Sequence, residues 1–317
     1  MLVAALTLTV GLALIAIASD QFVIGAARVS LALRVSPVVI GAVVIGFGTS
    51  APELVIGVMA ASRGDLGLAI GAVVGSNIVN LTLVAGVAAM ICPLVLSSST
   101  IRRELPLSVM AVVLLAAVIP GEMVRWEGAL LVAAFVGTML VIVVPALRLG
   151  RDSEVLGPET EEFLNDAPVR PRREWARTLA GMGGTILAAH MVVSSAKVLA
   201  TGLGVSDAVI GLTIVALGTS LPELVTAIQA ARRGEVDLVI GNLLGSNIFN
   251  SLAIAGVAVL VGPGVVSGEG ISVAGPVLMV GVTLLAAISM WTGRRLTRIE
   301  GAALVVAYIA SLPFLVA

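Results

Sequence analysis

The chain has 317 residues, of which 59% are hydrophobic and only 12% are charged. That balance excludes an ordinary soluble domain and predicts a protein whose solvent is a lipid bilayer. The formal net charge is −1, and basic residues form no run that would indicate a nucleic-acid partner. Aromatic residues are few and glycine is abundant, which favours close helix packing, so we expect an all-α integral membrane protein.

Apolar stretches of about 20 residues, the length that crosses a bilayer as a helix, recur along the whole chain. We expect about ten transmembrane helices. In chain order they cover 2–33, 36–62, 66–92, 104–120, 127–147, 177–203, 207–231, 236–262, 271–291 and 300–317. The first stretch lacks a basic N-terminal region and a small-residue cleavage site, so we expect a retained helix and not a signal peptide.

The ten spans form two groups of five: 1–147 is the first predicted repeat, 148–175 a charged, solvated linker, and 176–317 the second repeat. A shift of 170 residues aligns 36–87 with 206–257 without a gap, at roughly half identical positions. Because five helices per half is an odd number, the second half must insert upside down. Inverted repeats are typical of secondary transporters, whose substrate site lies between the repeats near the bilayer midplane.

Arginines gather in the loops on one side of the predicted helices. They are Arg34, Arg102, Arg103, the linker arginines, Arg232, Arg233, Arg294, Arg295 and Arg298. The opposite loops hold little beyond Arg63 and Arg125. The positive-inside rule therefore predicts a multi-pass protein of the cell membrane with a cytoplasmic linker and both termini outside.

Two carboxylates stand near the middle of predicted spans. Glu53 and Glu223 are placed where an ionised group is costly and usually marks function. Gly48 and Pro52 precede Glu53, and the related segment 218–223 repeats the pattern. These helix breakers predict broken helices at the midplane, with backbone carbonyls freed toward a protein-lined or watery cavity. Carbonyl and carboxylate oxygens are the ligands that a hard cation prefers.

A second polar motif is also duplicated, in the third and eighth spans. It consists of Ser76, Asn77 and Asn80 in one half and of Ser246, Asn247 and Asn250 in the other. Residues four apart share a helix face, so small polar oxygens are expected to face the glutamates. The combined carboxylates, carbonyls, hydroxyls and amides reach the six to eight ligands that calcium prefers. The sequence has no His or Cys cluster that would favour zinc or copper.

Each motif also has a purely structural interpretation. Ser50 with Glu53, and Ser220 with Glu223, fit a capping box that satisfies the free amides at a helix start. The serines and asparagines of the second motif fit hydrogen bonding between helices. Duplication of both motifs at mid-span favours binding, with which partial capping in the empty state is compatible.

The paired GTS-x-PE and GSN-x-x-N segments resemble the alpha repeats of the sodium/calcium exchanger family, within the calcium/cation antiporter superfamily. The likeness extends over the ten-helix layout and fits a prokaryotic type without regulatory domains. It implies that calcium is held by Thr49, Glu53, Thr219 and Glu223, the threonines through their carbonyls. It implies sodium ligands at Gly46, Thr49, Ser50, Glu53, Ser76, Asn80, Ala216, Thr219, Ser220, Glu223, Ser246 and Asn250. It further implies antiport by alternating access, with no enzymatic activity, no cofactor and no obligatory protein partner.

The counter-ion is the point on which alternatives remain open. Proton/calcium exchangers of the superfamily typically carry a GN-x-x-E form, which differs from the motif here and so favours sodium. Potassium-dependent relatives use an acid near the position of Asn250, which argues against potassium. The closest alternative is proton-coupled calcium or manganese exchange, with both glutamates protonated. An intramembrane hydrolase leaves the duplicated motifs unexplained, and a channel does not need broken, inverted repeats.

The first and sixth spans are related more weakly, and the 170-residue shift places Asp20 opposite His190. One interpretation is that each lies in a polar, water-accessible crevice with its own partners. The other is that they form a proton- or ion-sensitive gate. The family resemblance gives these two helices the moving role.

Overall fold

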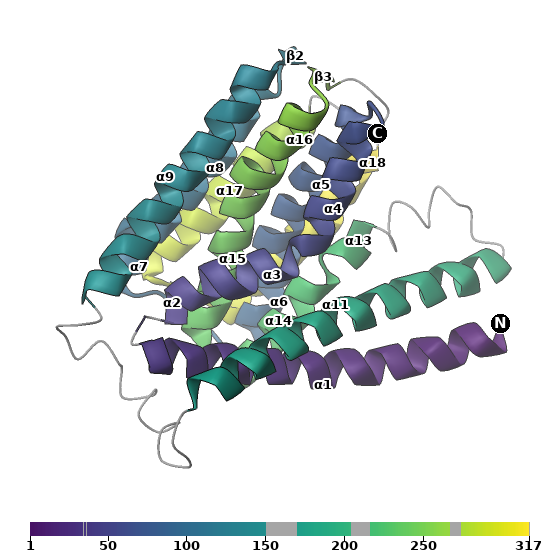
Figure 1. Ribbon diagram of the computed structural model, residues 1–317, viewed down its shortest axis with the longest axis vertical. Helices are drawn as coiled ribbons and strands as arrows, with labels where there is room; N and C mark the ends of the chain where they lie inside the picture. Colours follow the sequence, from purple (N-terminus) through teal and green to yellow (C-terminus); the bar gives the residue numbers. More distant parts are fainter. Residues whose placement is uncertain (34, 36, 150–169, 204–215, 267–273, 317) are drawn as a thin grey trace.

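The computed structural model of the chain describes residues 1–33, 35, 37–149, 170–203, 216–266 and 274–316. Within them the protein is almost entirely helical, which confirms the all-α prediction (Figure 1). Six of the described helices are long and apolar enough to cross a membrane, and the bent pair 38–49 and 51–62 makes a seventh. The arrangement of ten helices in two inverted repeats stays a prediction.

The described helices of the first half follow the predicted spans. They are α1 (Leu2–Leu33), α2 (Pro37–Ile40), the π-helical η1 (Gly41–Ile45), α3 (Gly46–Thr49), α4 (Ala51–Ser62), α5 (Leu66–Val79), η2 (Asn80–Val84), α6 (Ala85–Ile91), α7 (Ser98–Arg102), α8 (Glu104–Val118) and α9 (Arg125–Leu149). The second predicted span therefore consists of several short helical pieces, and the third is continuous through a π-helical turn.

The second half repeats this order. Its described helices are α11 (Pro171–Gly202), α13 (Ala216–Thr219), α14 (Leu221–Arg232), α15 (Val236–Ile248), η4 (Phe249–Ile254), α16 (Ala255–Val261), α17 (Ala274–Gly293) and α18 (Arg298–Val316). The first part of the seventh predicted span, 207–215, and most of the linker lie outside the described residues. Helix α11 begins inside the predicted linker 148–175, because Pro171 suits a first helical position and Glu174 is buried one turn later.

The Arg-Gly dipeptides duplicated in the two halves are helix C-caps. Gly64 follows α4 with a φ of 80°, and Gly234 follows α14 with a φ of 73°. Glycine adopts this left-handed conformation without steric cost. The Gly64 amide donates to the Ala61 carbonyl at 3.0 Å, and the Gly234 amide donates to the Ala231 carbonyl at 3.2 Å. Both bonds satisfy carbonyls that the ending helix leaves free.

Helices α1 and α11 lie side by side and run across the direction of the other helices (Figure 1). Polar contacts join them near the start of α11. Arg28 Nη1 lies 3.4 Å from Glu174 Oε1, and Arg177 donates from Nε and Nη2 to Gln21 Oε1 at 2.9 and 2.7 Å. Since the two helices also pack along much of their length, they form one tightly joined unit.

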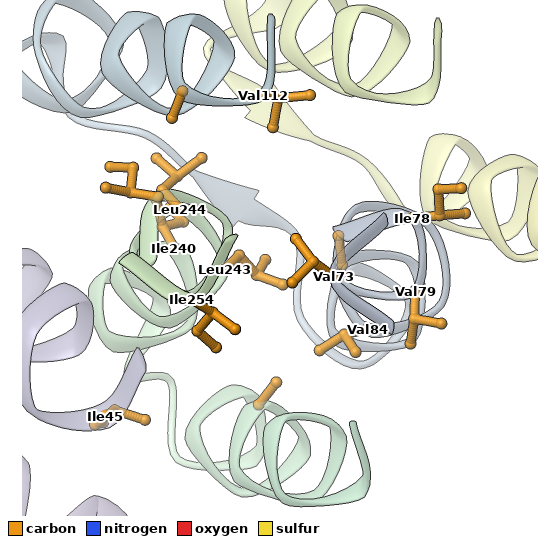
Figure 2. Close-up of a cluster of buried hydrophobic side chains, with 14 of the residues drawn as sticks. Ile45, Val73, Ile78, Val79, Val84, Val112, Ile240, Leu243, Leu244 and Ile254 are labelled. Carbon is orange, nitrogen blue, oxygen red and sulfur yellow. The ribbon is translucent and has the colours of Figure 1, made fainter. Parts of the chain in front are cut away.

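The continuous spans 66–91 and 236–261 form the centre of the bundle. Val73 and Leu243, which occupy equivalent positions in the two halves, are buried and point toward one another (Figure 2). Val84 and Ile254 are a second equivalent pair in the same cluster. Side-chain packing of this kind holds helices together where lipid removes the hydrophobic driving force. The halves therefore share one core and are not separate domains.

Two short antiparallel strand pairs also connect the halves. Strand β1 (Leu94–Val95) pairs with β4 (Arg295–Leu296), and β2 (Glu122–Met123) pairs with β3 (Gly264–Val265). Strands β1 and β3 are 170 residues apart and follow the repeat-related helices α6 and α16. Each strand pair thus joins one strand from each half.

Candidate functional site

Both GTS-x-PE segments turn at their serine. Ser50 has φ −85° and ψ 9°, and Ser220 has φ −88° and ψ 8°. Pro52 and Pro222 follow, and neither can donate the backbone hydrogen bond that would continue the preceding helix. The helices on the two sides of Ser50 are bent by 47°. The sequence therefore produces the same break in both halves, and α4 and α14 start again immediately after it.

Both glutamates lie in the first turn of the restarted helix and are enclosed, Glu53 being 2% and Glu223 1% exposed. Ser50 Oγ donates to Glu223 Oε1 at 2.9 Å. Ser76 Oγ donates to Glu53 Oε1 at 3.5 Å and lies 3.2 Å from Ser220 Oγ. A serine of one half thus holds the glutamate of the other, and the two motifs form one site.

The capping-box interpretation fails in the structure. Neither Ser50 nor Ser220 makes a side-chain hydrogen bond to a free amide of the helix that follows it. A capping residue normally has β-region dihedrals, which aim its side chain at those amides, whereas a ψ near zero turns both serines away. Their hydroxyls instead contact Glu223 and Ser76 across the boundary between the halves.

The asparagines of the second motif combine helix-to-helix contacts with free oxygens. Asn80 Nδ2 donates to Asn247 Oδ1 at 3.3 Å, and Asn250 Nδ2 donates to Ser76 Oγ at 3.1 Å. The Oδ1 atoms of Asn80 and Asn250 are buried without a hydrogen-bond partner among the described residues. The structural interpretation is therefore correct for the amide nitrogens of Asn80 and Asn250 and for the oxygen of Asn247, and it leaves the oxygens of Asn80 and Asn250 available.

The site contains four buried oxygens without a partner in the part of the chain that the structure describes. Two belong to the carboxylates, Oε2 of Glu53 and of Glu223, and two are the Oδ1 atoms of Asn80 and Asn250. Buried acceptors without a donor are costly, and a cation satisfies them. The described residues contain no cluster of three or more His, Cys, Asp and Glu side chains, which is the kind of cluster that holds a transition metal. The ligand atoms available here are all oxygens. Such a set fits calcium or sodium better than zinc.

A second cluster of oxygens lies beside the first break. Ser246 Oγ donates to the Gly46 carbonyl at 3.2 Å, and Thr49 Oγ1 donates to the Ile45 carbonyl at 3.0 Å. Asn242, which was not among the predicted ligands, also lies here, with its Oδ1 3.3 Å from Thr49 Oγ1. Its spacing of four residues before Ser246 was the available signal. Comparison of the repeats hides that signal, because the equivalent residue of the first half is alanine.

A cavity of about 610 Å³ lies between α4, α11, α13 and α14. Pro52 and Pro222, which immediately precede the two glutamates, line it together with Thr219. His190 and Ser194 of α11 line it as well, with Nε2 and Oγ 3.4 Å apart. Ala216, the remaining predicted ligand, begins α13 beside this cavity, and the residues just before it lie outside the described ranges.

At the other end of α14, helix α1 is held by an ion pair. Arg233 Nη2 lies 2.6 Å from Asp20 Oδ1. Gln229, one turn earlier, donates to the Ala16 carbonyl at 3.4 Å. Asp20 and His190, which the repeat comparison placed opposite one another, thus have different surroundings. The cavity reaches the site at the N-terminal end of α14, and ionic contact joins α1 to its C-terminal end.

The cavity predicts one-sided access that thiol labelling can measure. Cys92 is the only cysteine, so a Cys92→Ser background is unlabelled. In that background we expect the Ser194→Cys variant to react with a water-soluble thiol reagent at least about tenfold faster than Ser19→Cys, because exposure controls thiol reactivity. Ser19 lies on α1 and is fully buried, which makes it the matched control. Equal rates at both positions would contradict access of water to this cavity.

Comparison with known proteins identifies the relatives of this chain. It matches the family described as sodium/calcium exchanger protein over residues 3–144 and 174–317. It is 36% identical to the putative antiporter CaxA of Alkalimonas amylolytica over 98% of this chain and 97% of that protein. It is 30% identical to the sodium/calcium exchanger MaX1 of Methanosarcina acetivorans over 97% of each.

The fold agrees with these matches. A solved structure of the sodium-calcium exchanger NCX_Mj, soaked with zero Na⁺ and Ca²⁺, superposes with a TM-score of 0.86 at 27% identity and covers 99% of both chains. Sequence and fold agree across both halves, and on that ground the chain belongs to the sodium/calcium exchanger family of membrane antiporters.

Proposed function

We propose that this protein exchanges calcium for sodium across the cell membrane by alternating access. The single observation that carries the proposal is the set of four buried oxygens without partners in the described residues, two from carboxylates and two from amides. A buried charge of −2 that has no basic side chain among its contacts in the described residues needs a cation. The chain is an antiporter and not an enzyme, so the hydrolase alternative is set aside.

Calcium in this proposal lies between the two glutamates. Glu53 and Glu223 supply charge, and the carbonyls of Thr49 and Thr219, next to the two breaks, complete the site. The proposed sodium sites flank this position on both sides. Their ligands are Gly46, Thr49, Ser50, Glu53, Ser76, Asn80, Ala216, Thr219, Ser220, Glu223, Ser246 and Asn250. The contacts of Ser50 and Ser76 with the glutamates of the two halves support one shared cluster.

Exchange follows from competition for these oxygens. Two carboxylates are neutralised by one calcium ion or over-neutralised by three sodium ions, so the family stoichiometry of three to one would carry net charge. Without a bound ion, the two carboxylates would remain desolvated charges, which opposes the change of access from one side of the membrane to the other. In this proposal, α1 and α11 move together against the fixed core. The cavity at the N-terminal end of α14 then closes, and access opens at the C-terminal end of α14.

The proposed topology has ten transmembrane helices in two inverted repeats, a cytoplasmic linker and both termini outside. The equal backbone turns at Ser50 and Ser220, and the equal caps at Gly64 and Gly234, support the repeat relation. The arginine-rich loops support the orientation.

Proton coupling is the second candidate, with calcium or manganese as the transported ion. The observation that favours it is the burial of both glutamates, because a proton neutralises a buried carboxylate as a metal cation does. In that case protons would replace sodium on Glu53 and Glu223.

Flux measurements separate the two candidates. Purified protein is reconstituted into liposomes loaded with sodium and diluted into sodium-free buffer containing radioactive calcium. We expect uptake to exceed that of liposomes without a sodium gradient severalfold. We expect it to rise further when a potassium–valinomycin potential makes the interior positive, because three sodium ions leaving for one calcium ion entering would carry one positive charge outward per cycle. Uptake that ignores sodium but follows an imposed pH gradient would replace sodium by protons as the counter-ion.

A further inference from the structure

The buried amide of Asn242 has no role in the ligand set proposed above. Asn242 is 1% exposed and lies on α15, one helical turn before Ser246. Its Oδ1 lies 3.3 Å from Thr49 Oγ1 and 3.4 Å from Ser246 Oγ, and its Nδ2 has no partner among the described residues. The side chain therefore touches two hydroxyls that belong to one proposed sodium site.

The hydroxyls that Asn242 touches already have acceptors for their hydrogens. Thr49 Oγ1 is closest to the Ile45 carbonyl, at 3.0 Å, and Ser246 Oγ is closest to the Gly46 carbonyl, at 3.2 Å. Their lone pairs are then free to face an ion. With those hydrogens taken, Oδ1 of Asn242 has nothing to accept from either hydroxyl, so we assign the amide with Nδ2 in that place, donating one hydrogen to each hydroxyl. The amide thus fixes the direction of two oxygens at once.

The backbone around Asn242 gives the amide little room to move. A Cβ on Gly46 would lie 2.9 Å from the Ser246 nitrogen and 3.3 Å from the Asn242 carbonyl oxygen. Helix α15 therefore packs against α3 at backbone contact. Interiors packed in this way do not relax around a changed side chain, so the spacing between the amide and the hydroxyls is fixed.

The first half has no such amide. The residue equivalent to Asn242 is Ala72, whose methyl group cannot hydrogen-bond. Ser76, the equivalent of Ser246, contacts Glu53 Oε1 at 3.5 Å and accepts from Asn250 Nδ2 at 3.1 Å. The serines of the two halves are therefore held by different partners, and the pseudo-symmetry of the site is broken at this point.

We propose that Asn242 is a positioning residue for the flanking sodium site formed by Gly46, Thr49 and Ser246, and that it strengthens sodium binding there. The inference rests on the proposed sodium exchange. Calcium lies between the glutamates and does not use these hydroxyls, so loss of the amide weakens sodium binding and spares calcium.

The test measures sodium and calcium separately in proteoliposomes. Calcium–calcium exchange without sodium reports the central site, and its inhibition by added sodium reports the flanking sites. For Asn242→Ala we expect half-inhibition to need about five to ten times more sodium, the effect of one lost hydrogen bond, with sodium-free exchange unchanged. The matched control is Thr283→Val, which removes a buried hydroxyl of α17 that donates to the Met279 carbonyl at 2.7 Å and belongs to neither polar motif.

Each outcome decides a different point. An unchanged sodium requirement in Asn242→Ala, or an equal shift in Thr283→Val, overturns the role of Asn242. Asn242→Ala could instead abolish calcium–calcium exchange in the absence of sodium. If Asn242→Ser, a smaller change, then leaves the sodium concentration for half-inhibition unshifted, the residue is structural and the proposal is overturned. A wild-type protein that exchanges calcium without any inhibition by sodium rejects the proposed counter-ion itself, and is seen before any variant is compared.

Discussion

Sodium-driven calcium uptake is expected to be lost in Glu53→Gln and in Glu223→Gln. Each substitution keeps the shape of the side chain and removes one of two charges from an enclosed site. One carboxylate charge about 4 Å from the ion, at an effective dielectric constant of about 20, contributes about 4 kcal/mol of binding free energy for each unit of charge that the ion carries. We therefore expect calcium binding to weaken by about a thousandfold or more, measured as uptake by proteoliposomes at fixed calcium and as calcium binding by calorimetry.

Glu104→Gln is the matched control for these variants. Glu104 is also 2% exposed and lies in the first turn of a helix, but its carboxylate accepts from Arg103 at 2.8 Å and it does not contact the site. We expect this variant to lose stability and to keep its affinity for calcium. If purified Glu104→Gln loses calcium affinity as fully as the other two, burial of any carboxylate matters and the two glutamates are not the ligands.

The second large effect is expected on folding, from Gly245→Val. A Cβ on Gly245 would lie 2.8 Å from the carbonyl carbon of Ala42, which is backbone and cannot rotate away. Overpacking of a close contact costs about 1–3 kcal/mol or more, and the displaced segment also holds Gly46. We expect most of the protein to aggregate in detergent, and the folded remainder to show a Tm lowered by several degrees, measured by size-exclusion chromatography after heating.

Gly137→Val tests whether any branched residue on a helix has this effect. Gly137 lies on α9, is exposed, and has open space around it within the described part of the chain. We expect its Tm to stay within a few degrees of that of the wild type, because the only change is in helix propensity. Equal losses in both variants would mean that the close approach of α15 to residue 42 is not what limits folding.

Much of the site was predictable because the repeats display it twice. Glycine and proline in each GTS-x-PE segment predict where a helix must break, and the breaks at Ser50 and Ser220 are the same to within a few degrees. The glutamates follow from the cost of a carboxylate in an apolar span. The inverted topology and the ligand set remain predictions, since they depend on the membrane and on bound ions.

Other features depend on contacts between distant segments. The sequence predicts a capping box for Ser50, but the partner of its hydroxyl comes from α14, 173 residues away. Likewise the start of α11 inside the predicted linker depends on the contact of Glu174 with Arg28 of α1. Asn242 was missed because the repeat comparison selects what the halves share, and this amide is a difference between them.

In the proposed alternating-access cycle, the Asp20–Arg233 ion pair gives the two end states different energies. Alternating access in an inverted repeat lets the halves exchange roles, which would bring the equivalent positions, His190 and Arg63, into the place of this pair. Two bases cannot attract one another, so the exchanged conformation gives up an ion pair and gains none. A half-exposed pair contributes up to about 1 kcal/mol, or roughly a fivefold preference. In the proposed cycle the ion-free protein therefore prefers one side, set by four residues outside the proposed ligand set.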